Sequence, residues 1–276
     1  MARPKHTSSE RLRVAEIYRR RAAEASTRPS HRTRLTEIAD DVAGCRFLSP
    51  VTGFKQPSCR SRYCPACMTR MHAVPDREKI EDMFALVPDN TVRFVRLSLP
   101  DRVAGPQIRN AVNYLNKHLV RLRQSKGWND CVLSSAGVIH RRWKVESSRH
   151  GRAGFWIHTH LLLNCDREPD FDRIADKFRR DLMVPAGRRR ADYFDVVPLN
   201  ENVPRTATYM THVKHLVPGY HRWTEDADDP DGRLDMERMP VPDILHFGDS
   251  MHRARRLLRH GVPALAGQAR TGRSDR

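Results

Sequence analysis

The chain has 276 residues, with 50 Lys and Arg against 33 Asp and Glu, which gives a formal net charge of +17. Hydrophobic residues make up 39%, enough for a folded core, and no run of about 18 apolar residues exists to span a membrane. A charge surplus this large favours a polyanionic partner, most often nucleic acid; a soluble protein with a basic tail is the alternative. The start, Met1 to His6, lacks the apolar stretch of a secretory signal, so we expect a cytoplasmic protein.

The first third of the chain predicts helices around a cysteine-rich segment. Residues 8–43 carry apolar residues at helical spacing and read as two polar helices, separated at Pro29 and Ser30. Residues 45–67 are rich in Gly, Pro, Ser and Cys and show no sustained periodicity. A further helix is expected over 75–86.

From Pro88 onward the pattern is typical of an α+β domain. Residues 91–99 alternate apolar and polar side chains, which predicts a strand. The other expected strands are 132–145, 155–164 and 193–197, and the expected helices are 106–123, 171–182, 206–216 and a basic helix over 250–260. This order predicts an antiparallel sheet with helices packed on one face.

Four segments follow from these patterns. They are a helical N-terminal segment (1–44), a cysteine segment with its linking helix (45–87), a catalytic domain (88–220), and an acidic loop, basic helix and disordered tail (221–276).

Four cysteines have the spacing of a structural zinc site. Cys64 and Cys67 form a Cys-x-x-Cys turn, which directs two sulfurs at one point, and Cys59 and Cys45 can complete a tetrahedral set. Disulfides are the main alternative, and a cytoplasmic location disfavours them. We therefore expect these four cysteines to bind Zn²⁺.

Two histidines on one strand indicate a second metal site. His158 and His160 are two residues apart in the apolar segment 154–164, so both imidazoles point to the same face of a strand. A site for Mg²⁺ or Mn²⁺ also needs an oxygen ligand. Glu146 is the candidate, because a turn over 147–154 would bring it across from the region of His158 or His160; a solvated carboxylate is the alternative.

These motifs occur in an order that resembles a known family. The segment Cys59 to Cys67 (CRSRYCPAC), a Leu-Ser-Leu-Pro strand, Glu146 before a hairpin, and His-Thr-His followed by three leucines follow one another along the chain. Over about residues 45–217 the chain resembles the rolling-circle replication initiator (Rep) proteins of small plasmids, which belong to the His-hydrophobe-His (HUH) endonuclease superfamily. The middle residue of the pair, Thr159, departs from the usual apolar residue.

The resemblance implies an HUH/RRM-like catalytic domain that nicks and rejoins a DNA strand at an origin. A divalent metal polarises the scissile phosphate, and a tyrosine keeps the 5′-phosphate as a covalent link while a 3′-OH is freed for a polymerase. The implied partners are origin DNA, as a single strand or a hairpin, with host helicase and polymerase. Rolling-circle transposases share this chemistry, and a non-enzymatic, zinc-stabilised DNA-binding regulator is the alternative from another class.

The nucleophile is expected on a helix after the last strand of that domain. Tyr209 lies there, whereas Tyr193 begins a short strand and Tyr220 follows the helix end. In the family a lysine commonly follows the tyrosine by about three residues; here His212 takes that offset and Lys214 comes five after. On a continuous helix His212 would share the Tyr209 face and Lys214 would point away. Either cation could orient the phosphate, or His212 could accept a proton.

Basic residues surround the predicted hairpin. They are expected to contact DNA phosphates, which gives affinity without sequence readout, and solvated surface is the alternative. The residues are Arg141, Arg142, Lys144, Arg149 and Arg152.

Overall fold

The computed structural model describes residues 8–24, 26–45, 59–144, 152–197, 199, 201–220, 234–253 and 257–261. Within these ranges the strands form a five-stranded antiparallel sheet in the order β4-β1-β3-β2-β5. The strands are β1 (Val92–Ser98), β2 (Val132–Lys144), β3 (Gly154–Cys165), β4 (Phe194–Val197) and β5 (Leu257–His260). The expected α+β class and the four expected strands are confirmed.

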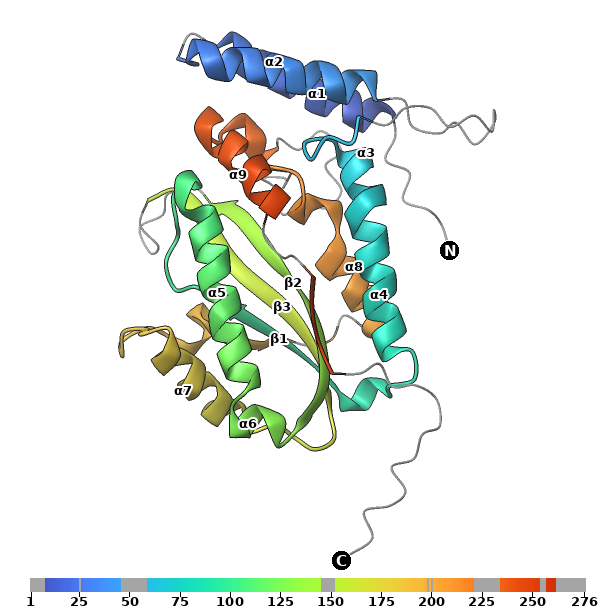
Figure 1. Ribbon diagram of the computed structural model, residues 1–276, viewed down its shortest axis with the longest axis vertical. Helices are drawn as coiled ribbons and strands as arrows, with labels where there is room; N and C mark the ends of the chain where they lie inside the picture. Colours follow the sequence, from blue (N-terminus) through green and yellow to red (C-terminus); the bar gives the residue numbers. More distant parts are fainter. Residues whose placement is uncertain are drawn as a thin grey trace, which may run out of the picture.

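Helices precede the sheet, connect its strands and follow it (Figure 1). The cysteine segment leads into a continuous helical run, in which α3 (Pro65–Met68) and a π-helical turn (Thr69–Ala73) precede α4 (Val74–Phe84). The remaining α-helices are α1 (Ser8–Ala23), α2 (Pro29–Gly44), α5 (Ile108–Arg123), α6 (Lys126–Asn129), α7 (Phe171–Asp181), α8 (Val203–Thr211) and α9 (Val241–Arg253). Both N-terminal helices were expected from their apolar stripes.

Helices cover both faces of the sheet, so the prediction that they pack on one face is wrong. Side chains alternate along β3, with Ile157, Leu161 and Leu163 in a large core together with α5 and α7. Leu162 points the other way, into a second core that α4 and α8 close (Figure 1). The physical reason is that Leu162 and its neighbours Phe94 and Val138 make this face apolar as well, and apolar surface must be buried.

The C-terminal region also differs from the prediction. Residues 250–260 were expected to form one basic helix, but α9 begins earlier, at Val241, and 257–260 form the edge strand β5. Leu257 and Leu258 pair with Val138 and Gly137 of β2. The open edge of β2 supplies backbone hydrogen-bonding groups that local helix propensity cannot indicate.

The N-terminal helices and the cysteine segment share the large core with the sheet. Tyr63 packs edge-on against Tyr18 of α1, with ring centroids 5.9 Å apart, and its hydroxyl donates to the Leu245 carbonyl of α9 at 3.2 Å. Arg62 donates to the Gly248 carbonyl at 2.9 Å. A Cβ on Gly248 would lie 2.1 Å from the Tyr63 ring, so glycine is required at this contact.

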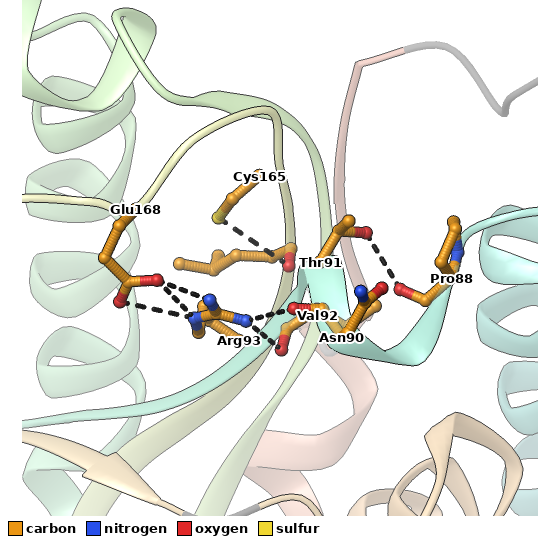
Figure 2. Close-up of polar contacts among 8 residues, drawn as sticks. Pro88, Asn90, Thr91, Val92, Arg93, Cys165 and Glu168 are labelled. Carbon is orange, nitrogen blue, oxygen red and sulfur yellow. Dashed lines mark hydrogen bonds and ion pairs between the residues drawn. The ribbon is translucent and has the colours of Figure 1, made fainter.

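A polar contact joins the start of β1 to the loop after β3 (Figure 2). Arg93 forms an ion pair with Glu168 and donates to the Asn90 carbonyl at 2.7 Å. Because the Glu168 side chain is 65% exposed, such a pair contributes about 1 kcal/mol or less. The register of β1 therefore depends mainly on its ladder with β3.

Among the helices of the described ranges, none combines the length and the apolar character that crossing a bilayer requires.

Candidate functional site

The four predicted cysteines come together as one group. Cys45, Cys59, Cys64 and Cys67 place their sulfur atoms within 4.8 Å of one another. The Sγ of Cys67 lies 3.5 Å from those of Cys45 and Cys59, too far for a disulfide bond. All six cysteines of the chain lie in the described ranges, and all are free. The group can hold a thiophilic metal ion such as zinc.

The backbone around Cys59 directs amide groups at the sulfur atoms. The amide of Ser61 donates to Cys59 Sγ at 3.4 Å, and the amide of Cys59 lies 3.5 Å from Cys45 Sγ. Arg60 between them has a φ of 50°, a left-handed conformation that a non-glycine residue rarely adopts. Hydrogen bonds with the thiols of Cys59 and Cys64 lower the pKa of Cys67. The loop thus brings backbone amide donors and four sulfur atoms to one point.

Three histidines form a second group, of which sequence analysis found two. His158 and His160 on β3 lie beside His140 on β2, and the ligand atoms of the three lie within 4.8 Å of one another. The His140 ring centroid is 5.1 Å from that of His158 and 4.8 Å from that of His160. All three residues are at most 4% exposed. We call them the histidine group.

The hairpin register explains why His140 belongs to this group, and it differs from the register expected for Glu146. His140 pairs directly with His158, and Val138 pairs with His160. The register that placed Glu146 across from either histidine is therefore wrong, and Glu146 itself lies outside the described residues. The signal for His140 was present in the sequence, since a hairpin centred near residue 149 pairs 140 with 158.

The protonation of the histidine group suits a metal ligand set. His140 Nε2 is 2.7 Å from the Met210 carbonyl oxygen, which can only accept, so Nε2 carries a proton and, in the neutral ring, Nδ1 carries the lone pair. Burial lowers the pKa of His158 well below its usual value, and burial, Arg96 and Lys214 lower that of His160 to about 3. Both residues present a buried Nδ1 with no hydrogen-bond partner among the described residues. Neutral imidazoles with available lone pairs can bind a cation.

Tyr209 lies beside the histidine group, at the surface. Its ring stacks on that of His160, with centroids 5.5 Å apart and planes at 26°, and the residue is 38% exposed. The other two tyrosines that follow the histidines, Tyr193 and Tyr220, are 4% and 8% exposed. Helix α8 positions Tyr209 because it begins at the Asn202 cap, whose side chain accepts from the Arg205 amide.

The roles expected for His212 and Lys214 change with the end of helix α8. The helix ends at Thr211, and His212 leaves it with a ψ of 140°. His212 Nδ1 accepts the Lys214 amide at 3.1 Å, so this nitrogen caps the following turn (Val213–His215) instead of facing a substrate. Lys214, expected to point away, folds back with Nζ 5.2 Å from the Tyr209 ring centroid.

A further histidine connects these elements and was not predicted. His215 is 5% exposed and stacks on His140, with centroids 3.8 Å apart and planes at 9°. Its ring also meets the edge of Tyr209 at 5.9 Å. Its position in a turn after α8 gave no periodic signal in the sequence.

The predicted DNA-binding residues do not share one surface. Neighbouring residues of a strand point to opposite faces, so Arg141 points away from the face that carries His140. Arg141 is 2% exposed and donates to the Met251 sulfur. Its predicted DNA contact is therefore wrong. Arg142, paired with Trp156, lies on the histidine face together with Lys144. Arg152 is exposed, and Arg149 lies outside the described residues.

Comparisons with family models, curated proteins and solved structures gave no match for this chain.

The cysteine group predicts a tightly held metal ion. We expect Cys64→Ser to lower the metal content of the purified protein from about one equivalent to near zero, because a structural site needs all four thiolates. Elemental analysis by mass spectrometry checks this. Cys131→Ser, at a buried thiol outside the group, should keep the metal; equal loss in both variants would refute the site.

The histidine group predicts a second metal site, which binds its ion more weakly than the cysteine group does. We expect His140→Asn to weaken Mn²⁺ binding at least about tenfold, because it removes one of three imidazole ligands. Electron paramagnetic resonance of free Mn²⁺ during a titration measures the affinity. His118→Asn changes an equally buried histidine on α5 and should bind as the wild type does; unchanged affinity in His140→Asn would contradict the ligand assignment.

Proposed function

We propose that this chain is a metal-dependent DNA-nicking and -joining enzyme that starts rolling-circle replication, with Tyr209 as its nucleophile. The observation that carries the proposal is the stacking of Tyr209 on His160, which puts an exposed phenol next to three buried imidazoles. The order of motifs and the surplus of basic residues support DNA as the substrate. The freed 3′-OH would serve a host polymerase, with a host helicase opening the duplex.

The ligand chemistry narrows the choice of metal ions. His140, His158 and His160 offer three imidazole nitrogens, which suit a transition metal better than Mg²⁺, a cation that prefers oxygen ligands. We therefore favour Mn²⁺ of the two expected ions. A bound divalent ion would supply Lewis-acid polarisation of a phosphate oxygen. For the cysteine group we propose structural Zn²⁺.

The chain's own residues would provide the remaining chemistry. The Tyr209 oxygen forms a bond to phosphorus, the bond from phosphorus to the 3′-oxygen breaks, and the phenol proton is transferred overall to that oxygen. Burial, and secondly Arg142, lower the pKa of Lys214. Its Nζ lies 5.2 Å from the Tyr209 ring centroid, where a protonated ammonium would stabilise the developing charge. Rejoining reverses these steps and conserves the phosphodiester bond energy.

Covalent capture tests the nucleophile. We expect the wild type, with Mn²⁺ and single-stranded oligonucleotides covering the DNA around its gene, to form an adduct that runs as a shifted band on a denaturing gel. Tyr209→Phe should lower the adduct at least about a thousandfold, because the attacking oxygen is gone.

The matched control is Tyr114→Phe. Tyr114 is 40% exposed, close to the 38% of Tyr209, but lies on α5 over the other face of the sheet. This variant should form the adduct as the wild type does. An adduct that survives Tyr209→Phe would refute the nucleophile, and no adduct with any oligonucleotide would favour the non-enzymatic regulator.

Substitutions of the two basic residues after Tyr209 are expected to change the rate of adduct formation by different amounts. Lys214→Gln should slow adduct formation about a hundredfold, because it removes a positive charge beside the reacting phosphate. His212→Asn should change the rate little, because an Asn oxygen can accept the Lys214 amide in place of Nδ1. Single-turnover rates at saturating DNA measure both; a slower reaction in His212→Asn than in Lys214→Gln would reverse the assignment.

A further inference from the structure

A cleft of about 310 Å³ lies beside the histidine group. It is formed by the ends of β1, β2 and β3 and by the segment that precedes β4. Five basic and two acidic side chains line it, an excess of three positive charges. The lining residues that matter here are Arg96, Arg102, Lys144, Trp156, Arg188 and Arg189. This volume is at the lower end for small-ligand sites and fits one nucleotide better than several.

Trp156 joins the cleft to the histidine group. Its ring stacks on that of His158, with centroids 4.2 Å apart and planes at 24°. The Arg96 guanidinium carbon lies 5.2 Å from the Trp156 ring centroid, and Lys144 Nζ lies 5.9 Å from it. An aromatic ring surrounded by cations is the surface that proteins use to bind a base together with its phosphate.

Tyr209 and this cleft flank the histidine group on different sides. On β3 every second residue points to the same face, so the side chains of Trp156, His158 and His160 follow one another along that face. Trp156 stacks on His158, whereas Tyr209 stacks on His160. In a displacement at phosphorus the attacking and leaving oxygens lie roughly in line, on opposite sides of the phosphorus atom. A phosphate at the histidine group, attacked from Tyr209, would direct its leaving oxygen toward Trp156.

We propose that the Trp156 cleft holds the nucleotide whose 3′-oxygen leaves, with its base on Trp156 and its 5′-phosphate among the arginines. The proposal rests on the proposed function. As the tyrosine–phosphorus bond forms and the bond to the 3′-oxygen breaks, that oxygen gains the proton lost by the phenol. The cleft then keeps the new 3′-OH beside the phosphotyrosine, which positions it for the reverse attack. Trp156 is accordingly a positioning residue for rejoining.

The experiment uses the full chain after covalent capture has mapped the nick. Two fluorescein-labelled oligonucleotides are titrated by anisotropy, one ending in 3′-OH at the nick (upstream) and one beginning just after it (downstream). Trp156→Leu should weaken upstream binding about tenfold, which is a typical cost for losing one stacked base, and leave downstream binding unchanged. Rejoining of the upstream oligonucleotide to the purified adduct should slow by a similar factor.

A second pair of variants keeps the test decisive if Trp156→Leu folds poorly. Arg189 lines the cleft with a 72% exposed side chain, and its neighbour Arg190 does not line it and packs over Phe194. Arg189→Gln should weaken upstream binding severalfold, and Arg190→Gln should not. Wild-type upstream affinity in both cleft variants, or a loss confined to the downstream oligonucleotide, would overturn the inference. In that case adduct formation would leave the proposed function standing, whereas the absence of any wild-type adduct would overturn both.

Discussion

The antiparallel pairing of β2 with β3 is the constraint on which both the fold and the candidate site depend. It runs from Val132 opposite Cys165 to Lys144 opposite Gly154, with one irregularity near its start. This register sets His140 against His158 and Arg142 against Trp156. A slip of one residue would turn these side chains to the opposite face, into the core of Ile157 and its neighbours. The apolar requirement of that core therefore fixes the position of the histidines.

One face of this hairpin changes character along its length, and the site lies at the change. Leu162 is buried under α4 and α8, His160 and His158 follow, and Trp156 borders the basic cleft. Helix α8 ends at this boundary, which leaves Tyr209 half exposed above His160. The hydrogen bond from His140 to the Met210 carbonyl fixes α8 to the histidine group. Helix α8 thus both closes the second core and carries the proposed nucleophile, Tyr209.

Periodic and short-range features were predictable from the sequence, and features set by long-range pairing were not. The strand over 91–99 follows from alternation, the strand over 155–164 from its apolar run, and the cysteine group from ligand spacing. Glu146 was expected across from the histidines through a turn whose centre the sequence does not fix to within a few residues, and His140 was not recognised as a candidate. Arg141 was assigned to the surface because of its charge, without considering which face of the strand its position gives it. Lys214 was placed by helical geometry, but the helix ends three residues before it.

Strand β5 illustrates the same limit at the C-terminal end of the described chain. Its residues, Leu257–His260, read as part of a basic helix, yet they complete the sheet against β2. An edge strand gains its stability from a partner far away in sequence, which local propensity does not contain. The second core under α4 and α8 was likewise hidden, because its contributors are spread over α4, β1, β2, β3 and α8, which are far apart in the sequence.

The most direct test of the account is anomalous diffraction from crystals of the chain grown with Mn²⁺, recorded at the manganese and zinc edges. The account predicts a zinc peak among the sulfurs of Cys45, Cys59, Cys64 and Cys67. It also predicts a manganese peak among ring nitrogens of His140, His158 and His160, with the Tyr209 hydroxyl facing it. Manganese bound only elsewhere, or histidine rings that hydrogen-bond to protein groups with no metal between them, would contradict it.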